Sequence, residues 1–233
     1  MNDGFVVRFT LRTPIVLNPS VGLDGILARL VFDRTGDLER AHRKLPLQQR
    51  EGVHFASQLF LEAPAPIASV PLVRNMKPGM GLTADMVRPQ RGAKLPRVRT
   101  HRGDFRTLMS RYSAYLPTAV WAFGSGDADS VRELLSDARA IGKKRALGFG
   151  EIADMEFEQL APPALFGLTA MDGSPARILP VDLWQAIGGT GSTKRDYAPV
   201  HLPRWQSPQV ECVLPAASVV SPARLRAMLG GTG

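Results

Sequence analysis

The regular alternation of apolar and polar side chains predicts a strand between residues 5 and 12. Apolar residues stand at every odd position from Phe5 to Leu11, and polar residues fill most of the positions between them. A period of two residues is that of a strand with one face on a core. Pro14 cannot donate a backbone hydrogen bond, so we expect the strand to end before it.

Three further patterns predict strands. Residues 53–61 are rich in apolar positions with strand-like spacing, and in residues 152–157 acidic side chains alternate with Met155 and Phe157. Residues 119–123 are apolar throughout and are followed by Gly124-Ser-Gly-Asp. A short apolar run that ends in turn residues is typical of a buried strand.

Two segments carry the spacing of apolar residues that is typical of a helix. In the first, Asp24 is the expected N-cap, and the apolar residues within 26–31 share one face. In the second, apolar residues recur at intervals of three and four between positions 131 and 141. The caps expected for this second helix are Asp129 or Ser130 at its start and Gly142 at its end.

The order of these elements is strand, helix, strand, basic segment, strand, helix, glycine-rich loop and strand. This order predicts an α+β fold, namely a ferredoxin-like (RRM-like) βαββαβ domain over residues 1–158, with the basic segment 73–112 as a long insertion. Pro and Gly are frequent in the rest of the chain. We therefore expect residues 159–233 to form a small C-terminal appendage, with a strand at 209–214 and a helix at 222–229.

The composition is that of a folded globular protein. Apolar residues make up 44% of the 233 residues and charged residues only 21%, whereas disordered chains are more charged and less apolar. The single cysteine, Cys212, suits a reducing compartment. The sequence shows neither a signal-peptide pattern nor an apolar run of about 20 residues. These features predict a soluble, cytoplasmic protein with no membrane contact.

The positive charge is concentrated in one segment. Lys and Arg number 29 against 21 Asp and Glu, a net charge of +8. Between Arg74 and Arg111 there are ten cations and two acids, which leaves nineteen of each sign in the rest of the chain. A basic segment attracts a phosphate backbone because binding releases condensed counterions. The alternative is a solvated surface loop, since clustered charge also serves solubility.

The stretch GKKRALGFGEI, which starts at Gly142, combines three glycines with three cations. Glycine adopts positive φ and allows close backbone approach, so Gly142, Gly148 and Gly150 would let the loop expose N–H donors to a phosphodiester, with the cations supplying charge. Alternatively, the glycines serve capping and packing while the cations face water. The loop is not a nucleotide-binding P-loop, because GxxxxGK[ST] is absent and the loop follows a helix.

These residues resemble a known family. A strand that ends in Gly-Asp, the helix VRELLSDARAIG and the loop GKKRALGFGEI are similar to the C-terminal glycine-rich motif of the RAMP superfamily of CRISPR-associated proteins. The segment PIVLNPSVGLDGILA and the basic insertion resemble the Cas five branch, which holds the 5′ end of the guide RNA. The segment LDGILARLVFD, the short length and the basic balance resemble the version of type IV effector complexes.

The resemblance implies a non-catalytic crRNA-binding subunit of a CRISPR ribonucleoprotein effector complex. It would cap the 5′ handle of the guide with its sheet and loop, and its insertion would be a thumb-like hairpin over the guide. The neighbouring backbone subunit and the large subunit are the expected protein partners, and target DNA is reached indirectly through the guide. No cofactor is expected. The residues expected to contact RNA are Gly142, Lys143, Lys144, Arg145, Gly148, Gly150, Arg91, Lys94, Arg97, Arg99, His101 and Arg102.

Two other functions compete with this one. Some members of the branch cut guide precursors without metal, and His101, with Tyr112 and Tyr115 nearby, is a conceivable general base for an endoribonuclease. The four histidines and one cysteine show no metal-ligand spacing, so no metal site is expected. The other alternative is a general single-stranded RNA binder with an RRM-like sheet, but no segment matches the aromatic RRM motif.

Overall fold

The computed structural model divides the chain into two compact units. The first comprises Met1–Ile67 with Tyr115–Gly233, and the second is Ala68–Ala114. The first unit combines sheets with helices, which confirms the prediction of a mixed fold. The residues that the structure describes are 3–17, 21–74, 108–161, 163–190, 193–215 and 217–231.

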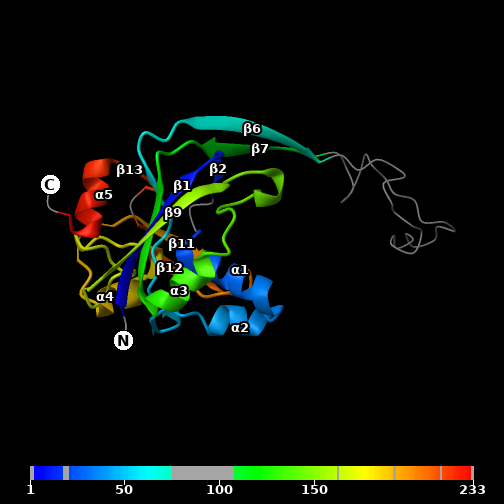
Figure 1. The fold of residues 1–233 in the computed structure, drawn as a ribbon. Helices are drawn as coiled ribbons and strands as arrows, with labels where there is room; N and C mark the ends of the chain where they lie inside the picture. Colours follow the sequence, from blue (N-terminus) through cyan, green and yellow to red (C-terminus); the bar gives the residue numbers. More distant parts are fainter. Residues whose placement is uncertain are drawn as a thin grey trace, which may run out of the picture. The chain divides into compact units, whose positions relative to one another are not determined.

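The first unit is built on a sheet with the strand order β13-β5-β8-β1-β9 (Figure 1). The interior strand β1 (Asp3–Leu11) pairs antiparallel with both β8 (Val120–Gly126) and β9 (Ile152–Leu160). β5 (Phe60–Glu62) pairs antiparallel with β8, and β13 (Val219–Val220) adds a parallel edge to β5. The strands predicted from the alternation in β1 and β9 are therefore confirmed.

Three helices cover one face of this sheet, α1 (Leu23–Thr35), α2 (Leu38–Arg43) and α3 (Ala128–Leu135). The odd-numbered residues of β1 from Phe5 to Phe9 are fully buried against their apolar side chains. The helices pack there because alternate side chains of a strand point to one face and meet the apolar stripe of each helix.

The predicted cap of α1 is wrong. Gly22 occupies the N-cap position, and Asp24 lies in the first turn of the helix with its side chain 1% exposed. The reason is that the Asp24 carboxylate binds arginines far along the chain, as described below, so it is held away from the capping position.

The second helix is shorter than predicted. Asp127 caps α3 by accepting the backbone N–H of Ser130 at 3.1 Å, where we expected Asp129 or Ser130 to be the cap. The helix ends at Leu135, whereas apolar periodicity predicted a helix to residue 141. Ile141 is buried but donates its N–H to the carbonyl of Gly150. The apolar spacing thus continued into a loop that packs on the same core.

The predicted second strand is divided. β3 (Gln49–Arg50) and β4 (Val53–His54) form a small hairpin, and β5 follows after a buried irregular segment. β2 (Ile15–Val16) is a short strand that follows β1. β8 continues through Gly124 and Gly126, where the sequence predicted a turn. A Cβ atom at these positions would lie 2.4 Å from the carbonyl oxygen of Phe55 and 2.3 Å from that of Pro46, so these glycines permit close backbone packing.

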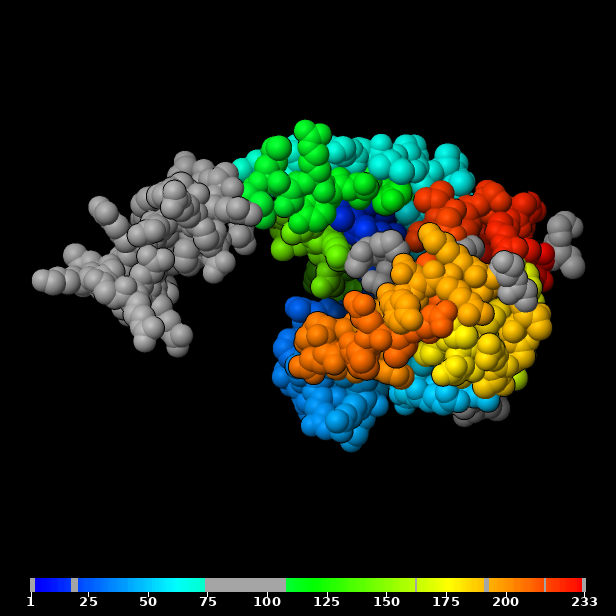
Figure 2. Space-filling model, turned by 180° about the vertical axis from the view of Figure 1, so that it is seen from behind, coloured from blue at the N-terminus to red at the C-terminus, as the bar shows by residue number. Residues whose placement is uncertain are grey.

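The C-terminal residues, which we expected to form an appendage from residue 159 onward, cluster with the main sheet. They contain β10 (Leu179–Pro180), α4 (Val181–Ala186), β11 (Arg195–Pro199), β12 (Gln209–Val213) and α5 (Pro222–Leu229). They belong to the same compact unit as the main sheet, and they bury Val6, Phe60 and Phe123 on its second face. Figure 2 shows them as one surface, coloured yellow to red. The sheet therefore has apolar cover on both faces.

The second unit contains two strands that are neighbours in one sheet, β6 (Ile67–Arg74) and β7 (Leu108–Tyr115). Both extend beyond the insertion predicted at 73–112, because β6 begins at Ile67 and β7 ends at Tyr115. Their exposed apolar residues include Val73 (62% exposed) and Met109 (59% exposed). The basic residues predicted between positions 91 and 102 lie outside the described residues.

Candidate nucleic-acid interface

The two ends of the glycine-rich loop are fixed by backbone hydrogen bonds. The N–H of Ile141 bonds to the carbonyl of Gly150 (2.9 Å), and the N–H of Gly150 bonds to the carbonyl of Pro14 (2.8 Å). The N–H of Lys143 bonds to the carbonyl of Val16 in β2 (2.7 Å). Because these bonds fix the base of the loop to the segment that follows β1, the tip is presented from a rigid support.

Two of the three glycines are required by this attachment. Gly142 has a φ of +84°, and a Cβ atom there would lie 2.8 Å from the carbonyl oxygen of Val16. Gly150 has a φ of +69°, and a Cβ atom would lie 2.0 Å from the carbonyl oxygen of Ile141. Gly142 is therefore not the cap of the preceding helix, as predicted, but a site of close backbone approach. For these two positions the packing explanation holds.

Gly148 differs from the other two glycines. Its φ is +85°, but a Cβ atom there would have no neighbour within 4 Å. It follows a single 3-10 turn, Arg145–Leu147, and it is exposed. Its positive φ favours glycine, and its N–H already bonds to the carbonyl of Arg145 at 2.9 Å, so what is open to a ligand is the space beside its Cα atom and not this donor.

The tip of the loop is cationic and exposed. Lys143, Lys144 and Arg145 are all exposed, and Leu147 beyond them is 60% exposed. Among the ion pairs of the described residues, none involves Lys143 or Arg145. Charges without an internal partner in water can bind a phosphate with little desolvation cost. The structure therefore brings together the predicted loop cations on one solvent-facing turn.

A second group of basic residues, which the sequence analysis did not identify, surrounds a buried carboxylate. Asp24 accepts a hydrogen bond at 2.9 Å from Arg177 and at 3.0 Å from Arg204. The Asp24 and Arg177 side chains are 1% and 5% exposed, and that of Arg204 is 21% exposed. Arg177 also donates to the carbonyl of His54 at 2.7 Å. Both arginines lie more than 150 positions from Asp24, so no local spacing could have indicated their contact with it.

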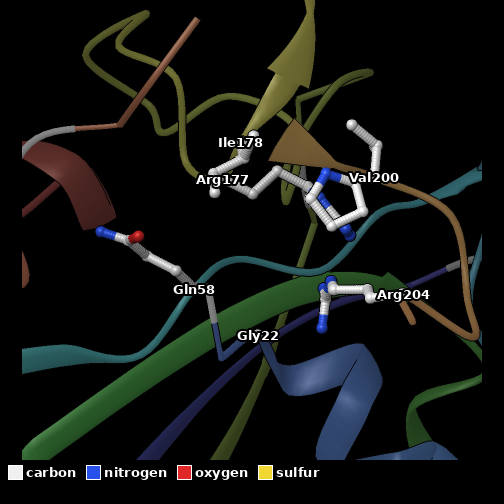
Figure 3. A pocket seen from close by; sticks show the side chains of 7 residues that line it. Gly22, Gln58, Arg177, Ile178, Val200 and Arg204 are labelled. Carbon is white, nitrogen blue, oxygen red and sulfur yellow. The ribbon is translucent and has the colours of Figure 1, made fainter. Parts of the chain in front are cut away.

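Electrostatics in this buried cluster favour the ionised carboxylate. Burial by itself would raise the pKa of Asp24, but the charges of Arg177, Arg204 and, less strongly, His54 hold that pKa well below its ordinary value. Burial lowers the pKa of His54, which disfavours a charged imidazole beside the two arginines. The adjoining cavity has a volume of about 10 Å³ and is lined by Gly22, Gln58 and both arginines, among others (Figure 3). The cluster therefore joins α1 to the C-terminal residues and has room for little more than a water molecule.

The described histidines have structural surroundings. His54 is buried, His42 contacts the exposed Trp205 edge-on with the ring centroids 5.5 Å apart, and His201 lies 3.2 Å from the carbonyl of Gly52. Within the described residues, no three metal-ligating side chains gather at one point. His101, the base imagined for RNA cleavage, lies outside the described residues.

The fold and the loop together define a mixed α/β protein with an exposed cationic turn suited to a phosphate-bearing ligand. The chain belongs to the family of the CRISPR type IV associated protein Csf3, whose family model matches residues 3–165. The matched part contains the main strands from β1 to β9, the cationic loop and the second unit. The predicted relation to type IV CRISPR proteins is thereby confirmed.

Other comparisons add little to this assignment. A chain in the cryo-EM structure of the Type III-B Cmr-beta bound to cognate target RNA is similar, with 14% sequence identity and a TM-score of 0.32. The match covers 67% of the present chain and 60% of that chain. No curated protein matches. Within the described residues, no helix is long and apolar enough to cross a membrane.

Proposed function

We propose that this protein is a non-catalytic crRNA-binding subunit of a type IV CRISPR effector complex, and that the loop at residues 142–150 holds the 5′ handle of the guide RNA. The observation that carries the proposal is the exposed cationic tip of a loop whose base is fixed by hydrogen bonds. Lys143 and Arg145 supply charge, and Gly148 leaves the space beside them free of a side chain, so that a phosphate can approach the turn.

The strand order supports a ferredoxin-like RAMP domain as the framework of this loop. The order β5-β8-β1-β9, with α1 following β1 and α3 joining β8 to β9, is that of a βαββαβ unit. RRM proteins bind RNA on the open face of such a sheet, but here Val6 and Phe123 on that face are covered by C-terminal residues. We therefore propose that RNA contacts the loops at the edge of the sheet. The sheet face, which we expected to take part, is covered.

The salt dependence of binding tests the role of the loop. Replacing Lys143, Lys144 and Arg145 together by Ala should weaken binding of handle RNA and lower the slope of log affinity against log salt by roughly 2, or about 0.7 for each lost phosphate contact. The matched control removes three exposed cations elsewhere, Arg43, Lys44 and Arg50, and should leave the slope nearly unchanged. Equal slopes in the two triple variants, both folded, would contradict the proposal.

The second unit is proposed to be the thumb-like hairpin that reaches a neighbouring backbone subunit. Deleting residues 80–102 and closing the gap with a short glycine linker should preserve the thermal transition of the first unit, which has its own core. Incorporation into the multi-subunit particle with crRNA should be lost. Normal incorporation, measured by size-exclusion chromatography, would show that the basic segment is a solvated surface only.

A cleavage assay separates this proposal from the competing endoribonuclease. Purified protein is incubated with labelled repeat RNA in EDTA, so that only metal-independent chemistry can proceed. We expect intact RNA, because the proposed role of the protein is to hold the handle, and because His54 is buried while His42 and His201 contact Trp205 and Gly52. Cleavage that is abolished by His101→Ala would favour the enzyme instead.

A further inference from the structure

A groove of about 590 Å³ lies between the second face of the main sheet and helix α5. Its apolar lining includes Trp121, Leu160, Met171 and Leu229. These four residues are the half-buried members of the apolar cluster on that face, whose other members are buried. Within the described residues, the apolar cluster on this face is thus incompletely covered at the groove, whose volume is in the range of sites that take a ligand or a peptide side chain.

The charge at this groove is opposite to that of the whole protein. Glu62 and Glu158 line it together with one cation, Arg226, in a chain of net charge +8. The Arg8 guanidinium lies 5.6 Å from the centre of the Trp121 ring but is paired with Glu156. Glu62 accepts a hydrogen bond from the indole Nε1 of Trp121 at 2.8 Å, which fixes the ring at the groove. Among the ion pairs of the described residues, none involves Glu62 or Glu158. Two carboxylates repel a phosphate backbone, so RNA is a poor occupant.

We propose that this groove binds a segment of a partner protein in which an apolar anchor residue is flanked by Lys or Arg. The anchor would cover Trp121 and Leu229, and the cation would neutralise Glu62 and Glu158. Such a combination of a desolvated aromatic contact and a complementary rim is typical of protein interfaces. The inference rests on the proposed role as a complex subunit, and it places this protein contact on a surface separate from the cationic loop.

A matched pair of charge reversals tests the groove. Glu158→Lys changes a residue of the groove, whereas Asp154→Lys makes the same change on an exposed residue of the same strand that does not line it. Each full-length variant is titrated against a particle of the remaining type IV subunits and crRNA. We expect Glu158→Lys to bind the particle at least tenfold more weakly than the wild type, and Asp154→Lys to bind normally. Equal recruitment of the two variants would overturn the inference.

A second measurement identifies the occupant. A photoreactive benzoylphenylalanine in place of Ala161, at the groove, should crosslink in the assembled particle to a protein segment that has Lys or Arg beside an apolar residue. A crosslink to RNA, or none, would overturn the inference. Binding of free handle RNA is measured in parallel and should be the same for wild type and Glu158→Lys. Failure of the wild type to bind handle RNA would instead refute the proposed function, so the two failures are distinguishable.

Discussion

Two groups of basic residues in this protein have opposite surroundings. Lys143 and Arg145 lie exposed at the tip of a loop, whereas Arg177 and Arg204 converge on the buried carboxylate of Asp24. A cation in water keeps its hydration until a ligand arrives, but a buried cation must have a counter-charge inside the fold. The first group is therefore available for binding, and the second group holds the structure together.

The largest expected effect comes from breaking the buried group. Arg177→Met leaves Asp24 buried with only the partly exposed Arg204 as partner, and removing one member of a buried pair costs about 3–5 kcal/mol of unfolding free energy. Chemical denaturation measures the loss. Handle RNA affinity of the folded protein should remain unchanged, because the loop is not part of the cluster.

Arg204→Met is the internal control for this prediction. Asp24 would keep its bond to the more deeply buried Arg177, so the loss of stability should be clearly smaller. If the two variants were equally stable, the Asp24–Arg177 ion pair would not be the contact that stabilises the packing of α1 against the C-terminal residues. If Arg177→Met weakened RNA binding at full stability, the division between the two groups would fail.

A second prediction compares two glycines of the loop. Gly150→Ala combines a positive φ with a Cβ atom 2.0 Å from the carbonyl oxygen of Ile141, so it should cost more than the about 1–2 kcal/mol expected for left-handed backbone strain alone. Gly148→Ala has the backbone strain without the steric overlap, so its loss of stability should stay at about 1–2 kcal/mol. Thermal unfolding of both variants checks the order.

Gly148 should also matter for RNA binding. Gly148→Val should lower handle affinity more than the loss of any single loop cation, because the side chain blocks backbone approach at an exposed position. Wild-type affinity in Gly148→Val would show that the open backbone at Gly148 has no part in binding, and would leave the cations alone to explain it.

The smallest expected effect is a dependence of the unfolding free energy on pH. The pKa of His54 is lowered by burial, so below its unfolded pKa of about 6.5 the unfolded chain binds a proton that the folded chain resists. Stability should therefore fall as pH decreases from about 7 toward 5, with a slope of at most about 1.4 kcal/mol per pH unit from this group. His54→Asn should flatten that part of the profile, as measured by denaturation at several pH values. An unchanged profile would exclude His54 as its source.

Asp24 contributes at more acidic pH. Its pKa is lower in the folded protein than in the unfolded chain, so its stabilising effect is complete above the unfolded value of about 3.9 and is lost as pH falls below it. The acid and near-neutral regions of the stability profile thus report different members of the same buried cluster.

Local sequence patterns predicted the strands and helices whose formation depends on neighbouring residues. Alternation identified β1 and β9, and apolar spacing placed α1 and the start of α3. Spacing failed at Ile141, because a buried side chain at the right interval can come from a packed loop as well as from a helix turn. The turn predicted at Gly124 was also wrong, because this glycine is a site of close backbone contact within strand β8.

The alternation of strands and helices, the concentration of charge and the composition of the cationic loop can be read from the chain alone, because they depend on neighbouring residues. The folded arrangement is needed to know which cations are paired, which glycines touch backbone, and that C-terminal residues cover the second face of the sheet. Those properties arise between residues distant in the chain, such as Asp24 and Arg177. Burial and ion pairing depend on the arrangement of the whole unit, and no local pattern carries that information.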